Sequence, residues 1–118
     1  SSIERMKAAG HRRIAIIPKE PELAEALFLH LNEEGLEGLQ HVSALDQELT
    51  EQIVFIPSTL VKGLEFEAVI IPNASELSYD TELDARLLFI SITRAQEALE
   101  LIYYDQPSRW LASHTNMP

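Results

Sequence analysis

The sequence contains no cysteine among its 118 residues, and this absence excludes disulfide bonds and metal sites built from thiolates. No apolar run approaches the roughly 20 residues that a membrane-spanning helix needs. The amino-terminal segment SSIERMKAAGHRR is charged and lacks the apolar core of a signal peptide. We therefore expect a cytoplasmic protein that makes no contact with a membrane.

Basic residues are also scarce, because 9 lysines and arginines face 19 acidic residues and give a net charge of −10. Residues 1–59 carry 5 basic and 10 acidic residues and residues 60–118 carry 4 and 9, so each half has a net charge of −5. A nucleic-acid strand would meet a repulsive long-range field. Any such contact must be local or supplied mainly by another domain, although a soluble acidic surface alone also explains the charge.

Several motifs of catalysis are absent. The sequence has no GxxxxGK[ST] phosphate loop, no GxSxG nucleophile motif and no strand that ends in the paired acids of a magnesium site. We therefore expect that the chain alone cannot hydrolyse a nucleoside triphosphate. We also expect no metal-binding residues, since the histidines neither cluster nor pair at i,i+4 spacing; they are His11, His30, His41 and His114.

The composition that remains, 46% hydrophobic and 24% charged, suits one compact domain over residues 1–118. Short apolar runs rich in β-branched residues, several of them closed by a proline, indicate buried strands. Because these strands alternate with helical segments, they predict an α/β fold with a parallel sheet covered by helices. We predict the strands at residues 14–17, 40–43, 53–56, 67–71 and 98–104.

Helices are predicted between these strands. The clearest begins in a first turn that contains Pro21 and ends at Gly35. Residues 82–95 suit either a buried helix or a strand, and their length, with Asp80 or Thr81 as N-cap, favours a helix. Shorter helices are predicted at 2–9, ended by Gly10, and within QPSRWL, with a frayed tail at 112–118. The apolar stripe of the clearest helix is expected to comprise Leu23, Ala26, Leu27, His30 and Leu31.

Two unusual segments follow predicted strands, at residues 57–65 and 72–81. In parallel sheets the functional groups gather at the carboxyl ends of strands, so we expect a site there. The first segment contains Lys62-Gly63, which taken alone is more often a plain turn before a strand.

Two stretches, STLVKGLEFEAVII and DARLLFISITRA, form a pair with a known counterpart. They resemble motifs V and VI of superfamily 1 helicases of the UvrD/PcrA/Rep type, and RRIAIIPKEPELAEALFLHL resembles motif IVa more loosely. Residues 62–66, KGLEF, match motif V without a substitution. The resemblance covers most of residues 12–104 and implies a RecA-like fold, the second motor lobe of a larger helicase. The residues that match motif VI are Arg86-Leu87, Phe89-Ile90 and Thr93-Arg94-Ala95.

The resemblance also implies roles in an ATP site whose Mg²⁺ and phosphate ligands lie mostly on the first lobe. Arg94 matches the arginine that reaches the γ-phosphate, and Glu65 matches a glutamate placed near the sugar and γ-phosphate. Gly63 would let the backbone approach the nucleotide closely. Arg86 is expected to orient Glu65 or the helix, although a structural ion pair explains it as well.

Nucleic-acid contacts are implied for the segment before KGLEF. Thr59 occupies the position where many members of the family have a histidine that contacts single-stranded DNA. Ser58, Thr59 and Lys62 are expected to donate hydrogen bonds to phosphate. The implied partners are the amino-terminal lobe of the same protein and single-stranded DNA.

Two other functions stay open at this point. The segment LVKGLEFEAVII also resembles helicase-like ATPases that remodel bacterial RNA polymerase. The acidic net charge and the absence of the DNA-contacting histidine favour RNA polymerase as the partner. A degenerate lobe that serves only as a scaffold is the third reading, and the intact KGLEF and TRA segments argue against it. Whether the chain belongs to a helicase or to an ATPase that remodels RNA polymerase, it is expected to be inactive as an ATPase in isolation.

Overall fold

The computed structural model describes residues 2–104 and 106–111. Its centre is a five-stranded sheet in the order β2-β3-β1-β4-β5, in which every pair of neighbours is parallel. The α/β class and the parallel sheet are therefore confirmed. The predicted frayed tail at 112–118 lies outside the described residues. The strands are β1 (Ile14–Ile16), β2 (Leu39–His41), β3 (Ile53–Phe55), β4 (Phe66–Ile71) and β5 (Ala95–Leu101).

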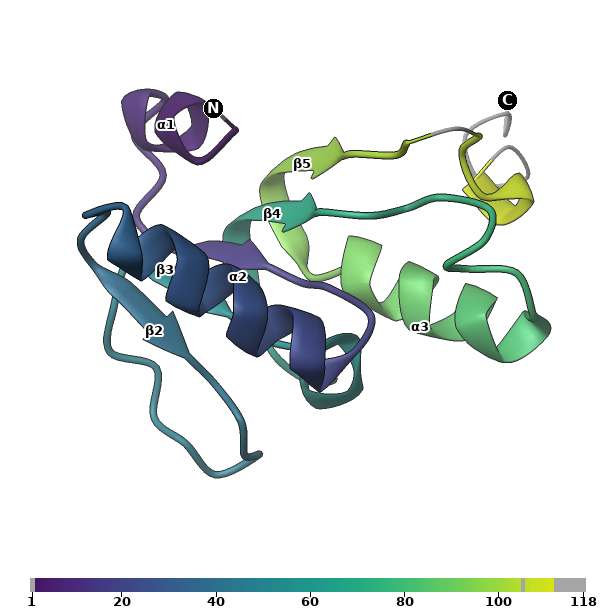
Figure 1. The fold of residues 1–118 in the computed structure, drawn as a ribbon, viewed down its shortest axis with the longest axis horizontal. Coiled ribbons are helices and arrows are strands. Elements are labelled where there is room, and N and C mark those ends of the chain that lie inside the picture. Colours follow the sequence, from purple (N-terminus) through teal and green to yellow (C-terminus); the bar gives the residue numbers. More distant parts are fainter. Residues whose placement is uncertain (1, 105, 112–118) are drawn as a thin grey trace.

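Helices cover both faces of the sheet (Figure 1). α1 (Ser2–Ala8) and α2 (Pro21–Glu33) pack on one face, and α3 (Glu82–Ile92) packs on the other beside the short 3₁₀ helix η1 (Ser58–Leu60). The three central strands β1, β3 and β4 are buried almost throughout, because helices or loops exclude water from both of their faces. Among the described residues, no helix is long and apolar enough to cross a membrane.

The ends of α2 follow local signals in the sequence. Pro21 is the first helical residue, and Gly35 follows the C-cap with φ +90°, while the Leu36 N–H donates to Leu31 O at 3.2 Å. The predicted apolar stripe was wrong in part, since Leu23, Ala26 and His30 are exposed. The side chains that face the sheet are Ala24, Leu27, Phe28 and Leu31.

α3 begins as predicted and ends earlier. Thr81 is its N-cap: its hydroxyl accepts from the Asp84 N–H at 3.1 Å, and the Asp84 carboxylate accepts from the Thr81 N–H at 3.2 Å. The helix was predicted to reach residue 95, yet it ends at Ile92 with Thr93 as C-cap. Pairing with β4 ends it, because the Phe66 N–H donates to Arg94 O at 2.9 Å and opens β5 at Ala95, not at residue 98.

The remaining predicted elements are short. The helix expected at residues 2–9 is α1, and of the helix expected within QPSRWL the described part is a helical turn at 109–111.

β5 is an edge strand with an irregular pairing. Phe66 of β4 pairs with Ala95 of β5, and Ala68 of β4 pairs with Ala98 of β5. The two pairs are thus two residues apart on β4 and three residues apart on β5. One extra residue is therefore inserted in β5 as a β-bulge, a feature that often lies beside functional sites.

Candidate functional site

The KGLEF segment is the connection that returns the chain from the carboxyl end of β3 to the amino end of β4. η1 turns the chain, the Leu64 N–H donates to Val61 O at 3.0 Å, and Gly63 has φ +86°. A Cβ atom on Gly63 would meet no atom within 4 Å, so the backbone there faces open space. Lys62 and Glu65 are exposed on either side of it.

Glu65 and Arg94 lie at the amino ends of β4 and β5, and this corrects one expectation from the sequence. The segment 57–65 was expected to place its chemistry at the carboxyl ends of strands. Only η1 lies at that edge, because residues 61–65 run back across the molecule before β4 begins. The candidate nucleotide residues and the candidate nucleic-acid residues Ser58 and Thr59 are therefore at opposite edges of the sheet.

Arg94 fastens the KGLEF turn to the end of α3. Its Nε donates to Ile90 O at 3.0 Å and its Nη1 donates to Leu64 O at 3.2 Å. Its Nη2 donates to Thr93 Oγ1 at 3.2 Å. A guanidinium beside a helix carboxyl terminus is also favoured by the helix dipole. Of the five N–H groups of an arginine, two stay available, so this half-buried cation can hold the turn and still donate to an anion.

Glu65 has a partner that the sequence did not indicate. Its Oε2 accepts a hydrogen bond from Gln96 Nε2 at 2.8 Å, and Gln96 lies in the bulged part of β5. No local pattern marks Gln96, because 31 positions separate it from Glu65 and only the β4–β5 register brings the two together. The bond orients an exposed carboxylate beside the Arg94 turn.

Arg86 lies apart from this pair. It is exposed on α3, and within residues 2–104 and 106–111 no hydrogen bond or ion pair joins it to Glu65 or to another side chain. The predicted helix 82–95 contained both arginines, but Arg94 lies beyond the end of α3 at Ile92, so the two are not on one helix. The role of Arg86 in orienting Glu65 stays a prediction, and the observed partner of Glu65 is Gln96.

At the opposite edge, Ser58 is a structural residue as the chain stands. It is 3% exposed, its hydroxyl donates to Lys19 O at 2.7 Å and its N–H donates to Pro18 O at 2.8 Å. Thr59 beside it is exposed. A phosphate therefore has direct access to Thr59 at this edge, whereas the Ser58 hydroxyl is already used. Lys62 is exposed as well, in the KGLEF turn that leads away from η1.

Lys19 organises the same edge, and the sequence did not single it out. Its Nζ lies 2.8 Å from Asp84 Oδ1 and donates to Ser78 O at 2.7 Å. The hydrogen bond from Lys19, with weaker help from the Thr81 and Asp80 N–H groups, lowers the pKa of Asp84 to about 2, although partial burial acts in the other direction. This ion pair ties the end of β1 to the start of α3.

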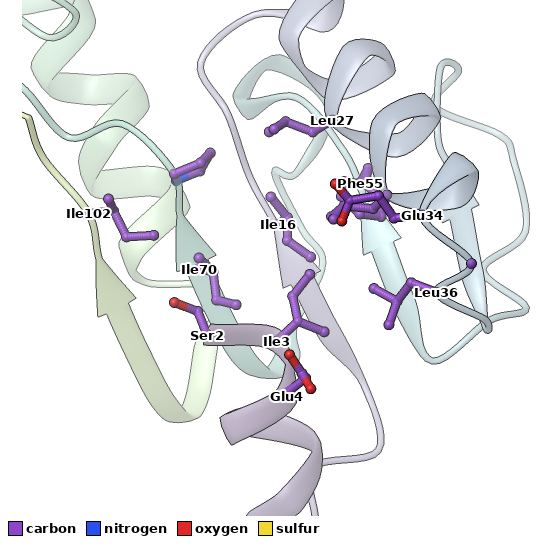
Figure 2. A pocket seen from close by; sticks show the side chains of 13 residues that line it. Ser2, Ile3, Glu4, Ile16, Leu27, Glu34, Leu36, Phe55, Ile70 and Ile102 are labelled. Carbon is purple, nitrogen blue, oxygen red and sulfur yellow. The ribbon is translucent and has the colours of Figure 1, made fainter.

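A pocket of about 500 Å³ lies between α1, α2 and the sheet. Figure 2 shows its apolar wall, which includes Ile16, Phe55 and Ile70, and the carboxylates of Glu4 and Glu34 beside it. The two carboxylates would repel a phosphate, the described lining contains no lysine or arginine, and neither Glu65 nor Arg94 lines this pocket. It is not the candidate nucleotide site.

Comparisons with known proteins agree on one family. The model of the UvrD-like helicase C-terminal domain matches residues 53–102. The crystal structure of the C-terminal domain of a possible DNA helicase from Lactobacillus plantarum WCFS1 is 32% identical, has a TM-score of 0.81, and is matched over 94% of this chain and 67% of that one. The chain belongs to the UvrD-like helicase C-terminal domain family. No curated protein matches it.

The match to the UvrD-like family covers the part of the fold that builds the candidate site. Residues 53–102 run from β3 through η1, the KGLEF turn, β4 and α3 to the end of β5. Arg94, Glu65 and Gln96 therefore all lie within the matched segment. The likeness to the Lactobacillus structure covers 94% of this chain and so extends well beyond residues 53–102.

The donor set at the amino edge fits one wall of an ATP–Mg²⁺ site. It combines an arginine with N–H groups to spare, an open glycine backbone and an exposed carboxylate that suits ribose hydroxyls. The sequence contains no phosphate loop, so the phosphate ligands that such a loop supplies are not among these residues.

Proposed function

We propose that this chain is the second RecA-like motor lobe of a UvrD-like DNA helicase and that it completes an ATP site on an amino-terminal lobe of the same protein. The observation that carries this proposal is Arg94, whose guanidinium is anchored to Leu64 O and Ile90 O beside the exposed Glu65. Family membership supports the lobe assignment, and the absence of a phosphate loop in the sequence supports the need for another lobe.

In this proposal Arg94 is the catalytic residue and its anchoring is part of the mechanism. An arginine stays charged in the transition state and presents a planar fork to phosphate oxygens. A group of this kind contributes a factor of about 10³–10⁵ in phosphoryl transfer. Because Arg94 is held by two backbone carbonyls, a shift of the KGLEF turn moves the guanidinium with it.

The other site residues have supporting roles in the same proposal. Glu65, oriented by Gln96, accepts from ribose hydroxyls, and Gly63 admits the nucleotide close to the backbone. Thr59 and Lys62 donate to the phosphates of single-stranded DNA. Opening and closing of the two lobes with each ATP turnover would move the strand. Bound Mg²⁺ neutralises phosphate charge, with its ligands on the other lobe.

The experiment is an ATP turnover assay on the chain joined to its first lobe, with and without single-stranded DNA. We expect DNA to stimulate turnover, Arg94→Ala to lower it by a factor of about 10³, and Thr59→Ala with Lys62→Ala to weaken only the stimulation. Turnover that Arg94→Ala leaves unchanged would remove Arg94 from the ATP site. DNA-independent turnover would remove the translocation role.

A second function is supported by the charge of the chain. A net charge of −10, spread over both halves, and a threonine where many relatives have a DNA-contacting histidine suit a protein partner better than a nucleic acid. Under this alternative the motor remodels RNA polymerase. The same turnover assay separates the two functions, because stimulation by polymerase and none by single-stranded DNA would select the alternative.

A further inference from the structure

Three metal-ligating side chains meet at the amino edge of the sheet, from segments far apart in the sequence. His11 lies between α1 and β1, Glu67 is in β4 and Glu97 is in the bulged part of β5. One ligand atom from each lies within 4.8 Å of the other two. His11 Nδ1 and Glu97 Oε1 are 3.2 Å apart.

The group is held in place by the backbone around it. The N–H of His11 donates to Met6 O at 3.3 Å, and the carbonyl of His11 accepts from Gln52 Nε2 at 3.0 Å. The imidazole is 11% exposed. Glu67 Oε1 accepts from the Arg12 N–H at 2.7 Å, which fixes that carboxylate beside the histidine. The His11 main chain and the Glu67 carboxylate are therefore already positioned, and a preorganised site loses less free energy on binding. Because the ligand atoms are bounded only by 4.8 Å, the side chains close further around a bound cation.

The spacing and the donor types select a class of cation. One imidazole nitrogen and two carboxylate oxygens form a mixed donor set that zinc accepts, whereas Mg²⁺ prefers oxygen ligands alone. Two ligands at about 2.0–2.1 Å on a tetrahedral zinc ion lie about 3.3 Å apart, close to the observed separation of His11 and Glu97. A dication would also relieve the repulsion between the two carboxylates.

We propose that His11, Glu67 and Glu97 bind one divalent transition-metal cation of the Zn²⁺ class, with water in the remaining position. The sequence predicted no metal site, because 56 and 30 positions separate the three ligands and only the sheet brings them together. Gln96, the partner of Glu65, is adjacent to Glu97 in the bulge. The bound ion fastens the starts of β1, β4 and β5 beside the candidate ATP site.

The chain contains its own control for this proposal. His30 Nε2 on α2 and Glu34 Oε1 at its C-cap are 2.8 Å apart, both side chains are exposed, and no third ligand joins them among the described residues. Among the described residues a histidine therefore pairs with a glutamate at two places, His11 with Glu97 and His30 with Glu34. Only the first has a third ligand, Glu67.

The test uses the untagged 118-residue chain with Zn²⁺ as the probe, followed by calorimetric titration and by thermal unfolding. We expect one ion per chain and a rise in the unfolding temperature. Glu97→Gln, at an exposed position, and His11→Gln should each weaken Zn²⁺ binding by at least about tenfold, whereas His30→Gln should leave it unchanged. Replacing Zn²⁺ with Co²⁺ should give the intense visible bands of tetrahedral coordination.

The contrary results are equally specific. Absence of stoichiometric Zn²⁺ binding to the folded wild-type chain would overturn the proposal. So would binding that Glu97→Gln retains in a folded variant, or binding that His30→Gln removes. Circular dichroism of each variant establishes that it is folded, and Glu67→Gln, which keeps an acceptor for the Arg12 N–H, supplies a third variant.

Discussion

The ion pair between Lys19 and Asp84 gives a stability prediction with a definite dependence on pH. Asp84 accepts from Lys19 and from the Thr81 and Asp80 N–H groups, and its pKa falls from an ordinary 3.8 to about 2. Without screening by solvent, a pKa difference of this size would correspond to about 2.5 kcal/mol of unfolding free energy. Because the pair lies at the surface, solvent screening reduces the expected contribution to about 1 kcal/mol.

The sign follows from the lowered pKa of the folded state. The carboxylate stabilises the fold fully above about pH 4, and this contribution is lost as the pH falls toward about 2. Asp84→Asn keeps an oxygen for the two N–H groups and removes the charge. We expect the variant to be about 1 kcal/mol less stable near neutral pH, with about half of that difference remaining near pH 3.

The assay is urea unfolding followed by circular dichroism, performed for both proteins at several pH values. Glu82→Gln, in the same first turn of α3, is the matched control and should show a smaller and less pH-dependent change. A difference between wild type and Asp84→Asn that stays constant from neutral pH to about pH 3 would refute the reasoning. Equal stability at neutral pH would refute it as well.

Three further substitutions test separate parts of the fold, each by urea unfolding. Gly63→Ala should cost about 1–2 kcal/mol through the positive φ alone, since its Cβ meets no neighbour, and an unchanged midpoint would contradict that. Tyr79→Phe removes a buried hydroxyl without a hydrogen-bond partner among the described residues, so its stability should equal or exceed that of wild type. Burial also raises the pKa of Tyr79, so the variant should lose none of the tyrosine absorbance that titrates near pH 10. Leu88→Ala, at a fully buried position, should cost about 2–5 kcal/mol, and a loss below about 1 kcal/mol would contradict the packing of α3 on the sheet.

The features that were predicted from the sequence are those with local causes. Gly35 and Thr81 mark helix ends through backbone conformation and capping, which depend on a few neighbouring residues. The buried strands were found because runs such as IAI and IVF are apolar throughout. The motif pair then indicated the candidate site residues, Glu65 and Arg94 among them.

What could not be predicted depends on contacts between distant residues. Nothing in TRAQEALE marks the end of a helix, and α3 stops because Arg94 O pairs with Phe66 of β4. The bulge in β5 exists only as a relation between two strands, so Gln96 and Glu97 could not be assigned partners from the sequence. His11 appeared isolated for the same reason. Family resemblance supplied the residues of the candidate site, and the register of β4 with β5 supplies their geometry.

The central claim is that Arg94 acts in ATP hydrolysis while it holds the KGLEF turn. The direct measurement is the single-turnover rate of ATP hydrolysis by the chain joined to its first lobe. It is made for wild type, for Arg94→Lys and for the control Arg109→Lys. Arg109 pairs with Glu76 and Asp80. Lysine keeps the charge and a donor for Leu64 O but lacks the fork. We expect Arg94→Lys to fold, to bind ATP and to hydrolyse it at least about 100-fold more slowly, with Arg109→Lys unchanged. Hydrolysis by folded Arg94→Lys within a few-fold of wild type would contradict the claim.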